Sequence, residues 1–150
     1  MKKTSIFGKN DQRKVNPEWF TDKTWMKILS EKIKSKDQDI YHVHFEKGSR
    51  TKLHQHNGNQ VLIGIKGNGS LEIFKKYGTS KNNFKIKKIE RISINQGDIV
   101  HIPAKTLHTH GSINKKEFSH IAINILPKKN STYKTDWYES DFKSTVTKII

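Results

Sequence analysis

The chain has 150 residues, which is one domain's worth of sequence and enough to bury a core. Its apolar share is only 32%, so that core must be thin, as in a sandwich or a small barrel. The absence of cysteine excludes disulfides, thiolate metal sites and cysteine nucleophiles. The start, MKKTSIFGKNDQRKV, lacks an apolar run of signal-peptide length, and no later segment could span a membrane. We therefore expect a cytoplasmic protein.

The formal net charge of +15 raises the question of a nucleic-acid partner. Only three of the basic residues are arginine, whereas recognition of bases and phosphates favours the guanidinium fork. The lysines are scattered along the chain as single residues and doublets. This distribution indicates a solvated basic surface and argues against a nucleic-acid partner.

Three parts are expected along the chain. Residues 1–39 form an N-terminal arm followed by an irregular packing segment, NPEWFTDKTWMKIL (16–29). From residue 40 to residue 126 apolar and polar residues alternate in short segments separated by Gly, Asn and Pro, which predicts an all-β barrel. A break between two of these strands is expected at GNG (67–69). Residues 127–150 form a tail in which Trp137, Phe142, Val146 and Ile149 recur at helical intervals, so we expect a C-terminal helix packed on the barrel.

The stretch HQHNGNQ (54–60) carries the first chemical signal. Residues i and i+2 of a strand point the same way, so His54 and His56 present both rings to one face. The Asn-Gly turn then reverses the chain and brings Gln60 beside them. Two ring nitrogens and one amide oxygen converge there, which is the beginning of a metal site.

A second stretch, GDIVHIPAKTLHTHG (97–111), offers the remaining ligand. Its best donor is His108, and His110 lies on the same face two residues later. In FSHIAIN (118–124), His120 and Asn124 share one face. The pair His42 and His44 is a rival set, but its strand presents apolar residues on the other face, so we expect these two rings to point outward.

Together these stretches resemble the two cupin motifs. The first runs from Gly48 through His54, His56 and Gln60 to Gly67, and the second runs from Gly97 through Pro103 to His108. The resemblance implies a single cupin jelly-roll β-barrel with a short N-terminal extension. It also implies a metal site made of His54, His56, Gln60 and His108. Buried, hydrogen-bonded polar residues without a metal are the alternative for this set.

The first motif usually supplies Glu where this chain has Gln60. A small single-domain cupin group that includes cupin-type hydroxynitrile lyases uses Gln there, and it is similar to this chain in HTHG (108–111) and HIAI (120–123). This resemblance implies a metal-dependent lyase with His110 and His120 as catalytic residues. The alternative for these two histidines is that they pack around the metal ligands without taking part in catalysis. Four residues are expected to line the substrate pocket: Tyr41, Val43, Thr51 and Asn124.

Three imidazoles and an amide oxygen suit one divalent transition metal per chain, with Mn²⁺ or Fe²⁺ preferred and Zn²⁺, Ni²⁺ or Co²⁺ as alternatives. The expected function is that of a small metalloenzyme acting on a small oxygenated organic substrate, in which the metal is a Lewis acid and a histidine is the general base. An Fe²⁺- and O₂-dependent dioxygenase for diketones or enols is the first alternative, and a non-catalytic metal- or ligand-binding cupin is the second. We expect a homodimer, with a tetramer as the alternative, because a small barrel exposes a sheet face that needs cover.

Overall fold

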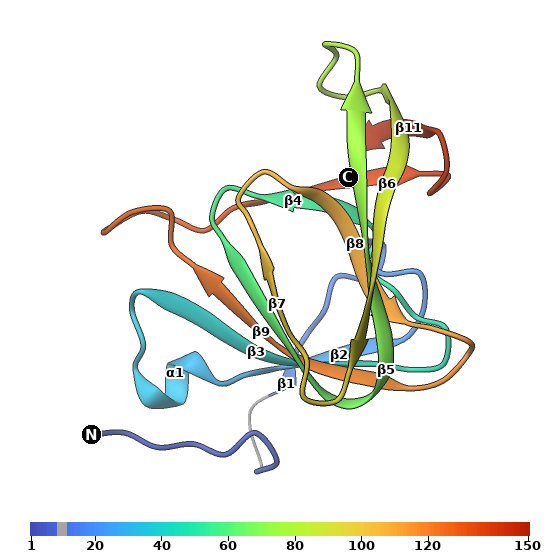
Figure 1. Cartoon of the computed structure of the whole chain (residues 1–150). Helices are drawn as coiled ribbons and strands as arrows, with labels where there is room; N and C mark the ends of the chain where they lie inside the picture. The colour runs from blue at the N-terminus through green and yellow to red at the C-terminus, as the bar shows by residue number, and fades with distance from the viewer. Residues whose placement is uncertain (9–11) are drawn as a thin grey trace.

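The structure is a computed structural model that describes residues 1–8 and 12–150. Two antiparallel sheets face each other and share the long strand β5, which runs from one sheet into the other (Figure 1). The first sheet contains, in spatial order, β1 (Gln12–Arg13), β2 (Thr24–Ile28), β3 (Gln38–Phe45), β9 (Phe118–Ile125), the first part of β5 (Gln60–Tyr77) and β7 (Ile99–Ile102). The second contains the rest of β5, β6 (Phe84–Asn95), β11 (Thr145–Ile149), β10 (Thr135–Ser140), β4 (Leu53–His56) and β8 (Leu107–Ser112).

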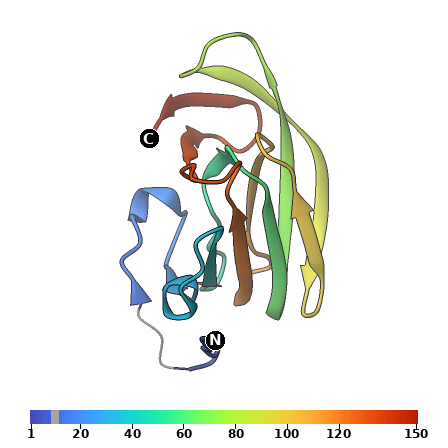
Figure 2. The same ribbon diagram turned by 90° about the vertical axis from the view of Figure 1, so that its left-hand side faces the viewer.

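Pairing of β8 with β5 as well as with β4 closes the second sheet on itself. The alternating segments thus form the β-barrel that they predicted, and it is the cupin jelly-roll that the resemblance to the two cupin motifs implied. Figure 2 shows the sheets from the side, with the first strands of the chain beside the barrel. Helical structure in the described residues is limited to α1 (Ser30–Ile33) and a 3-10 turn (Pro17–Trp19). None of the described helices is long and apolar enough to cross a membrane.

The expected C-terminal helix is wrong. Residues 135–149 form two strands instead: β10 pairs with β4, and β11 pairs with β6. The physical reason lies in the composition of the segment, because Thr, Val, Trp, Tyr and Ile favour a pleated surface over a helix. Val146 is fully buried in a cluster with Phe84 and Tyr138, so the strand pairing also completes a core.

The expected strand break at residues 67–69 is also wrong. β5 passes through GNG without ending, and the glycines allow it to bend between the two sheets. Gly67 has a positive φ of 70°, and a Cβ on Gly69 would lie 2.4 Å from the ring of the fully buried Phe118. Glycine is therefore required here for close packing of the chain and not for a turn.

The change Gly69→Ala tests this reading of the bend. The added methyl group would have to displace Phe118, so the free energy of unfolding should fall by about 1–3 kcal/mol, as is usual for overpacking a core. Urea denaturation measures this loss. Gly78→Ala is the control: Gly78 has a positive φ but open space around it, so only backbone strain of about 1–2 kcal/mol is expected. A stability for Gly69→Ala equal to that of the parent would contradict the reading.

Candidate metal centre

The two sequence motifs meet across one strand pair. His54 on β4 is the direct cross-strand partner of His108 on β8, and their ring centroids lie 4.1 Å apart. His56 lies two residues further along β4, with its ring centroid 5.4 Å from that of His108. All three side chains are buried inside the barrel. Antiparallel pairing thus brings together residues that are more than fifty positions apart in the sequence.

Each of these rings is held through its Nδ1 atom. His54 Nδ1 lies 2.8 Å from the carbonyl oxygen of Lys52, and His108 Nδ1 lies 2.8 Å from that of Thr106. A carbonyl can only accept, so both rings donate from Nδ1 and keep a lone pair on Nε2. His56 Nδ1 contacts the hydroxyl of Thr135 at 2.8 Å. Outer hydrogen bonds of this kind orient the histidine ligands of metal sites.

The inward-facing atoms are unsatisfied. The Nε2 atoms of His56 and His108 and the Oε1 atom of Gln60 are buried without a hydrogen-bond partner in the described part of the chain. The Nε2 atom of Gln60 donates to Asn124 Oδ1 at 2.8 Å, which leaves the amide oxygen free. Buried acceptors without partners are costly, so a positive ion among them would relieve that cost. Imidazole nitrogens with one amide oxygen suit a divalent transition metal.

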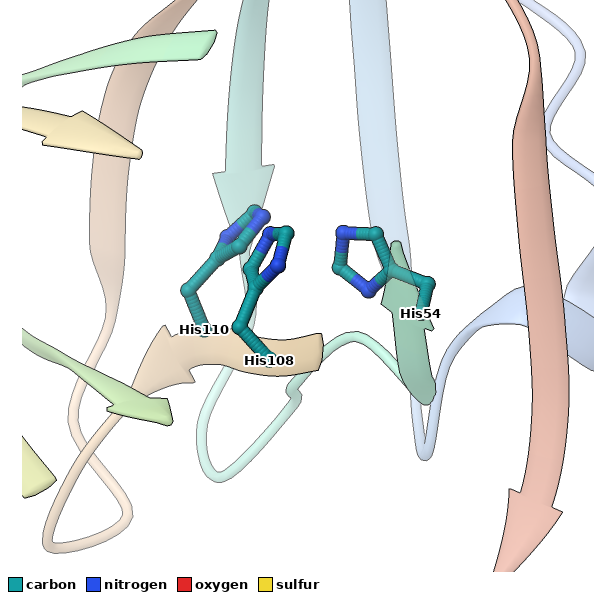
Figure 3. A group of neighbouring side chains, drawn as sticks. All are labelled: His54, His108 and His110. Carbon is teal, nitrogen blue, oxygen red and sulfur yellow. The ribbon is translucent and has the colours of Figure 1, made fainter. Parts of the chain in front are cut away.

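His110 lies equally close to this cluster. One nitrogen each from His54, His108 and His110 lie within 4.8 Å of one another, and this three-histidine group could hold a metal ion. Figure 3 shows the rings of His108 and His110 side by side, with His54 facing them. The structure thus brings together the expected ligands His54 and His108 with the expected catalytic residue His110. The assignment of His56, and not His110, as the third histidine ligand stays a prediction.

His110 and His120 form a buried pair. His120 Nε2 lies 3.1 Å from His110 Nδ1, so one N–H is shared between the two rings. His120 is enclosed by Phe45 and Phe118, with ring centroids 5.3 and 5.6 Å away. The backbone of His110 exchanges hydrogen bonds with Thr51, whose hydroxyl accepts from His110 N at 3.0 Å. Thr51 therefore fixes the strand that carries His110.

A cavity of about 520 Å³ opens beside these histidines. The four residues expected to line a substrate pocket all lie in its wall, although their role in binding stays a prediction: Tyr41, Val43, Thr51 and Asn124. The remaining wall is mixed, with apolar side chains such as Trp19, Phe20 and Met26 and with the charged side chains of Arg13, Lys14, Glu31 and Asp39. A volume of this size suits a small organic molecule.

The interior histidines are held neutral by burial. Removal from water lowers the pKa of His56 to about 3, that of His108 to about 4 and that of His120 to about 3. Burial, followed by the charges of neighbouring histidines, also lowers the pKa values of His54 and His110 well below the usual range. The rings therefore present lone pairs at neutral pH, as metal ligands and proton acceptors must.

The sequence reading missed three residues around the cluster. Trp137 on β10 stacks on His54 with ring centroids 4.4 Å apart, and Thr135 on the same strand holds His56. Tyr133 lies against the other side of His56, with ring centroids 5.0 Å apart. Burial, followed by the charges of Asp39 and Tyr41, raises the pKa of the Tyr133 hydroxyl above its usual value, so it stays protonated. The alternation in TDWYES was the available signal for this strand.

The rival pair lies outside the cluster. His42 and His44 face away from the barrel interior and pack on Trp25, whose ring is stacked on His44 at 4.9 Å. His44 Nδ1 contacts Ser119 Oγ at 2.6 Å, and His42 Nδ1 contacts the carbonyl of Ile6 at 3.3 Å. These contacts hold the Nδ1 atoms of both rings on the outer face of the first sheet, whereas His42 Nε2 is buried there without a hydrogen-bond partner among the described residues.

Acidification should destabilise the metal-free protein. A histidine whose pKa is lowered on folding stabilises the folded state above pH 6.5, its unfolded pKa, and this contribution is lost as the pH falls towards the folded pKa. The free energy of unfolding should therefore fall between pH 6.5 and about 4, by up to about 1.4 kcal/mol per pH unit for each ring that stays neutral. Urea denaturation after EDTA treatment measures how steeply the free energy of unfolding changes with pH. His120→Asn should reduce this slope by about the contribution of one histidine. A flat profile in the parent would show that the rings are not held neutral.

Comparison with known proteins agrees with this fold. The family model described as auxin binding protein matches residues 26–147. A comparison with curated protein sequences finds no match. Among solved structures, a cupin-like protein from Thermotoga maritima shares 26% identity with a TM-score of 0.63, covering 91% of this chain and 90% of that one.

More distant likenesses show the fold alone. A cupin superfamily protein from Desulfitobacterium hafniense has 14% identity and a TM-score of 0.51, over 69% of this chain and 78% of that one. Bacillus subtilis oxalate decarboxylase has 20% identity and a TM-score of 0.57, over 77% of this chain and 28% of that one. The family match covers most of the chain and includes both histidine motifs. This chain therefore belongs to the auxin-binding protein family and has the cupin fold.

Proposed function

We propose that this protein is a divalent-metal-dependent cupin enzyme that acts on a small oxygenated organic substrate, with His110 and His120 as its proton-transfer pair. The observation that carries the proposal is the 3.1 Å contact between these two buried rings, directly beside histidines whose Nε2 atoms lack partners among the described residues. A hydroxynitrile-lyase-like reaction is the specific form that we favour.

The proposed metal ligands are the Nε2 atoms of His54, His56 and His108 and the Oε1 atom of Gln60. All four are neutral, so an ion there would keep its full double charge. A divalent ion would act as a Lewis acid, polarising a substrate oxygen and making its hydroxyl more acidic. Mn²⁺ and Fe²⁺ are the preferred ions, with Zn²⁺, Ni²⁺ and Co²⁺ as alternatives.

The histidine pair would then move the proton. With Nδ1 turned towards His120, His110 has Nε2 as its free nitrogen. In the tautomer in which His110 Nδ1 donates to His120, a substrate proton taken at His110 Nε2 displaces the Nδ1 proton towards His120 Nε2. Because burial lowers the pKa of both rings, they can accept a proton only from an acidified hydroxyl.

A cyanohydrin illustrates the balance of the proposed step. Loss of the hydroxyl proton to His110 forms the carbonyl double bond, and the electrons of the C–C bond leave with cyanide. The histidine pair returns the same proton to cyanide, so the products are a carbonyl compound and hydrogen cyanide. No oxidant is needed, which separates this route from the dioxygenase alternative.

A ligand-binding role without turnover is the second candidate. The name of the matched family refers to binding and not to catalysis. The aromatic side chains in the mixed wall of the cavity would suit such a role equally well. A metal-loaded protein that binds a small organic ligand but does not turn it over would favour this candidate.

Four single changes test the ligand set. If His56 is a ligand and His110 is not, His56→Ala should lower bound metal far below one ion per chain, whereas His110→Ala should keep close to one. His54→Ala and His108→Ala should lose the metal under either ligand set. Elemental analysis of protein loaded with Mn²⁺ and desalted measures the stoichiometry. Retention of metal in His56→Ala together with loss in His110→Ala would make His110 the third ligand.

The proton-transfer assignment has its own test. His120→Ala should keep the metal but lower turnover, with a loss of about 10²–10⁴-fold if the pair is the general base. Turnover of cyanohydrins is followed with and without oxygen, and persistence without oxygen distinguishes a lyase from a dioxygenase. His101→Ala is the matched control, because His101 is an exposed histidine on β7. Parental turnover in His120→Ala would refute the catalytic role of the pair.

A further inference from the structure

Two lysine doublets of the sequence come together where the ends of β5 and β6 pair. Residues 75–88, which we call the basic hairpin, contain six lysines and no acidic residue. Figures 1 and 2 show that this hairpin extends beyond the neighbouring strands at one end of the molecule. All six of its lysines are exposed: Lys75, Lys76, Lys81, Lys85, Lys87 and Lys88. The fold therefore concentrates positive charge that the sequence spreads over doublets and single residues.

One face of the basic hairpin carries three of these lysines. Lys75 is directly opposite Lys87 in the strand register, and Tyr77 is directly opposite Lys85. Because alternate residues of a strand share a face, all four side chains lie on the same side. The Nζ atom of Lys75 lies 5.4 Å from the centre of the Tyr77 ring. Like charges placed directly opposite each other destabilise a strand pair, so this arrangement has a cost that an anionic partner would remove.

The carboxylates of the protein leave most of this charge unpaired. Among the described residues, only one of the six lysines has a carboxylate partner: Lys88 Nζ lies 2.8 Å from Glu72 Oε1. Asp141 lies in a turn that adjoins β6, since Ile86 N donates to Ser144 O at 2.8 Å. Its carboxylate, however, accepts hydrogen bonds from backbone N–H groups of its own turn. The other five lysines are therefore available to a negatively charged partner.

Apolar groups are exposed beside these lysines. Tyr77 is 44% exposed on the lysine-bearing face, and Ile89, at the bulge where the hairpin joins the barrel, is 58% exposed. A hollow of about 460 Å³ lies at this point, and its lining combines Ile89 with Lys75, Lys76 and Lys105. Exposed apolar side chains among lysines are typical of a surface that meets lipid headgroups, because the ammonium groups stay at the phosphates while the apolar groups enter the interface.

The kind of basic residue favours a lipid surface over nucleic acid. The basic hairpin contains no arginine, whose planar fork recognises phosphates and bases in a fixed geometry. Lysines on flexible stems suit the diffuse negative charge of a membrane, and a cluster of about four to eight basic residues is enough to bind an anionic leaflet. Ile89 would stay in water on a phosphate backbone, whereas a lipid interface would bury it.

We propose that the basic hairpin is a docking surface for an anionic lipid membrane, which the protein binds peripherally. The lysine-bearing face meets the anionic headgroups, and Tyr77 and Ile89 enter the interface beside them. None of the residues 75–88 lines the cavity beside the histidines, so docking in this way leaves that cavity free. The proposal is therefore independent of the metal centre and of the reaction proposed for it.

Vesicle binding by the full-length protein tests the docking surface. Sedimentation with vesicles of phosphatidylcholine and phosphatidylserine in equal amounts is compared with sedimentation with vesicles of phosphatidylcholine alone. The protein should bind the mixed vesicles about tenfold or more tightly, and added salt should weaken this binding by screening the charges. Lys75→Gln/Lys87→Gln should lower the affinity for mixed vesicles about tenfold or more. Urea denaturation should show no loss of stability in this variant, because it removes two like charges that face each other.

Lys128→Gln/Lys129→Gln is the matched control. It removes the same charge from exposed lysines in the loop between β9 and β10, away from the basic hairpin (Figure 1), and should bind mixed vesicles nearly like the parent. Equal binding to the two kinds of vesicle, no binding to mixed vesicles, parental affinity in Lys75→Gln/Lys87→Gln, or an equal loss in the control would each overturn the proposal. A double-stranded DNA oligonucleotide is the last probe. If the protein binds it through Lys75 and Lys87 but does not bind vesicles, the hairpin is a nucleic-acid surface and the lipid assignment is wrong.

Discussion

The need to keep a group of imidazole rings uncharged in the interior of the barrel governs the structure around them. A protonated ring there would lose its hydration and meet neighbouring rings that could also gain charge, so burial holds the pKa values of the group down. The chain satisfies this constraint locally. In both β4 and β8 the histidine donates from Nδ1 to the carbonyl two residues earlier, Lys52 for His54 and Thr106 for His108. The same hydrogen bond, used twice, turns the Nε2 lone pairs of His54 and His108 inward. A cation can bind there in place of the protons that these rings do not carry.

Support for these rings comes from the C-terminal strand that the sequence led us to expect as a helix. Apolar residues at positions 137, 142, 146 and 149 fit a helical period, but they also fit two short strands joined by a turn, and periodicity alone cannot separate these readings over so few residues. The turn is held by Asp141, whose side chain accepts from the backbone N–H groups of Lys143, Ser144 and Thr145. As a strand, the segment pairs with β4 and places Trp137 and Thr135 directly beside the two histidines of the first motif. A helix could not have provided these cross-strand neighbours.

The features that could be predicted are those fixed by local geometry. Alternation along a strand places His54 and His56 on one face, and the barrel follows from the same alternation in the segments from 40 to 126. The relation between His110 and the proposed ligands could not be predicted, because it depends on how far β8 is shifted along β4, and sequence spacing does not fix that register. Tyr133 could not be found either, since the hydrogen bonds of Asn57 that hold it join segments more than seventy residues apart. Hydrogen bonds between segments so far apart leave no pattern in the local sequence.

The charge of the site bears on the chemistry that we propose for it. The proposed ligand set is neutral and would leave the full charge of a divalent ion in the interior, and the guanidinium of Arg50, held on Ser70 and Ser112, further lowers the pKa of His110. A proton placed on the His110–His120 pair would therefore be held only briefly. The pair contacts the rings of Phe45 and Phe118, and both histidines also line the cavity, so a proton on the pair would leave it towards the cavity. This arrangement suits a reaction in which the proton removed from the substrate returns to a product within the same turnover. The proposed cleavage to a carbonyl compound and a protonated leaving group meets that condition, because the leaving group is released in the cavity, where it can take the proton.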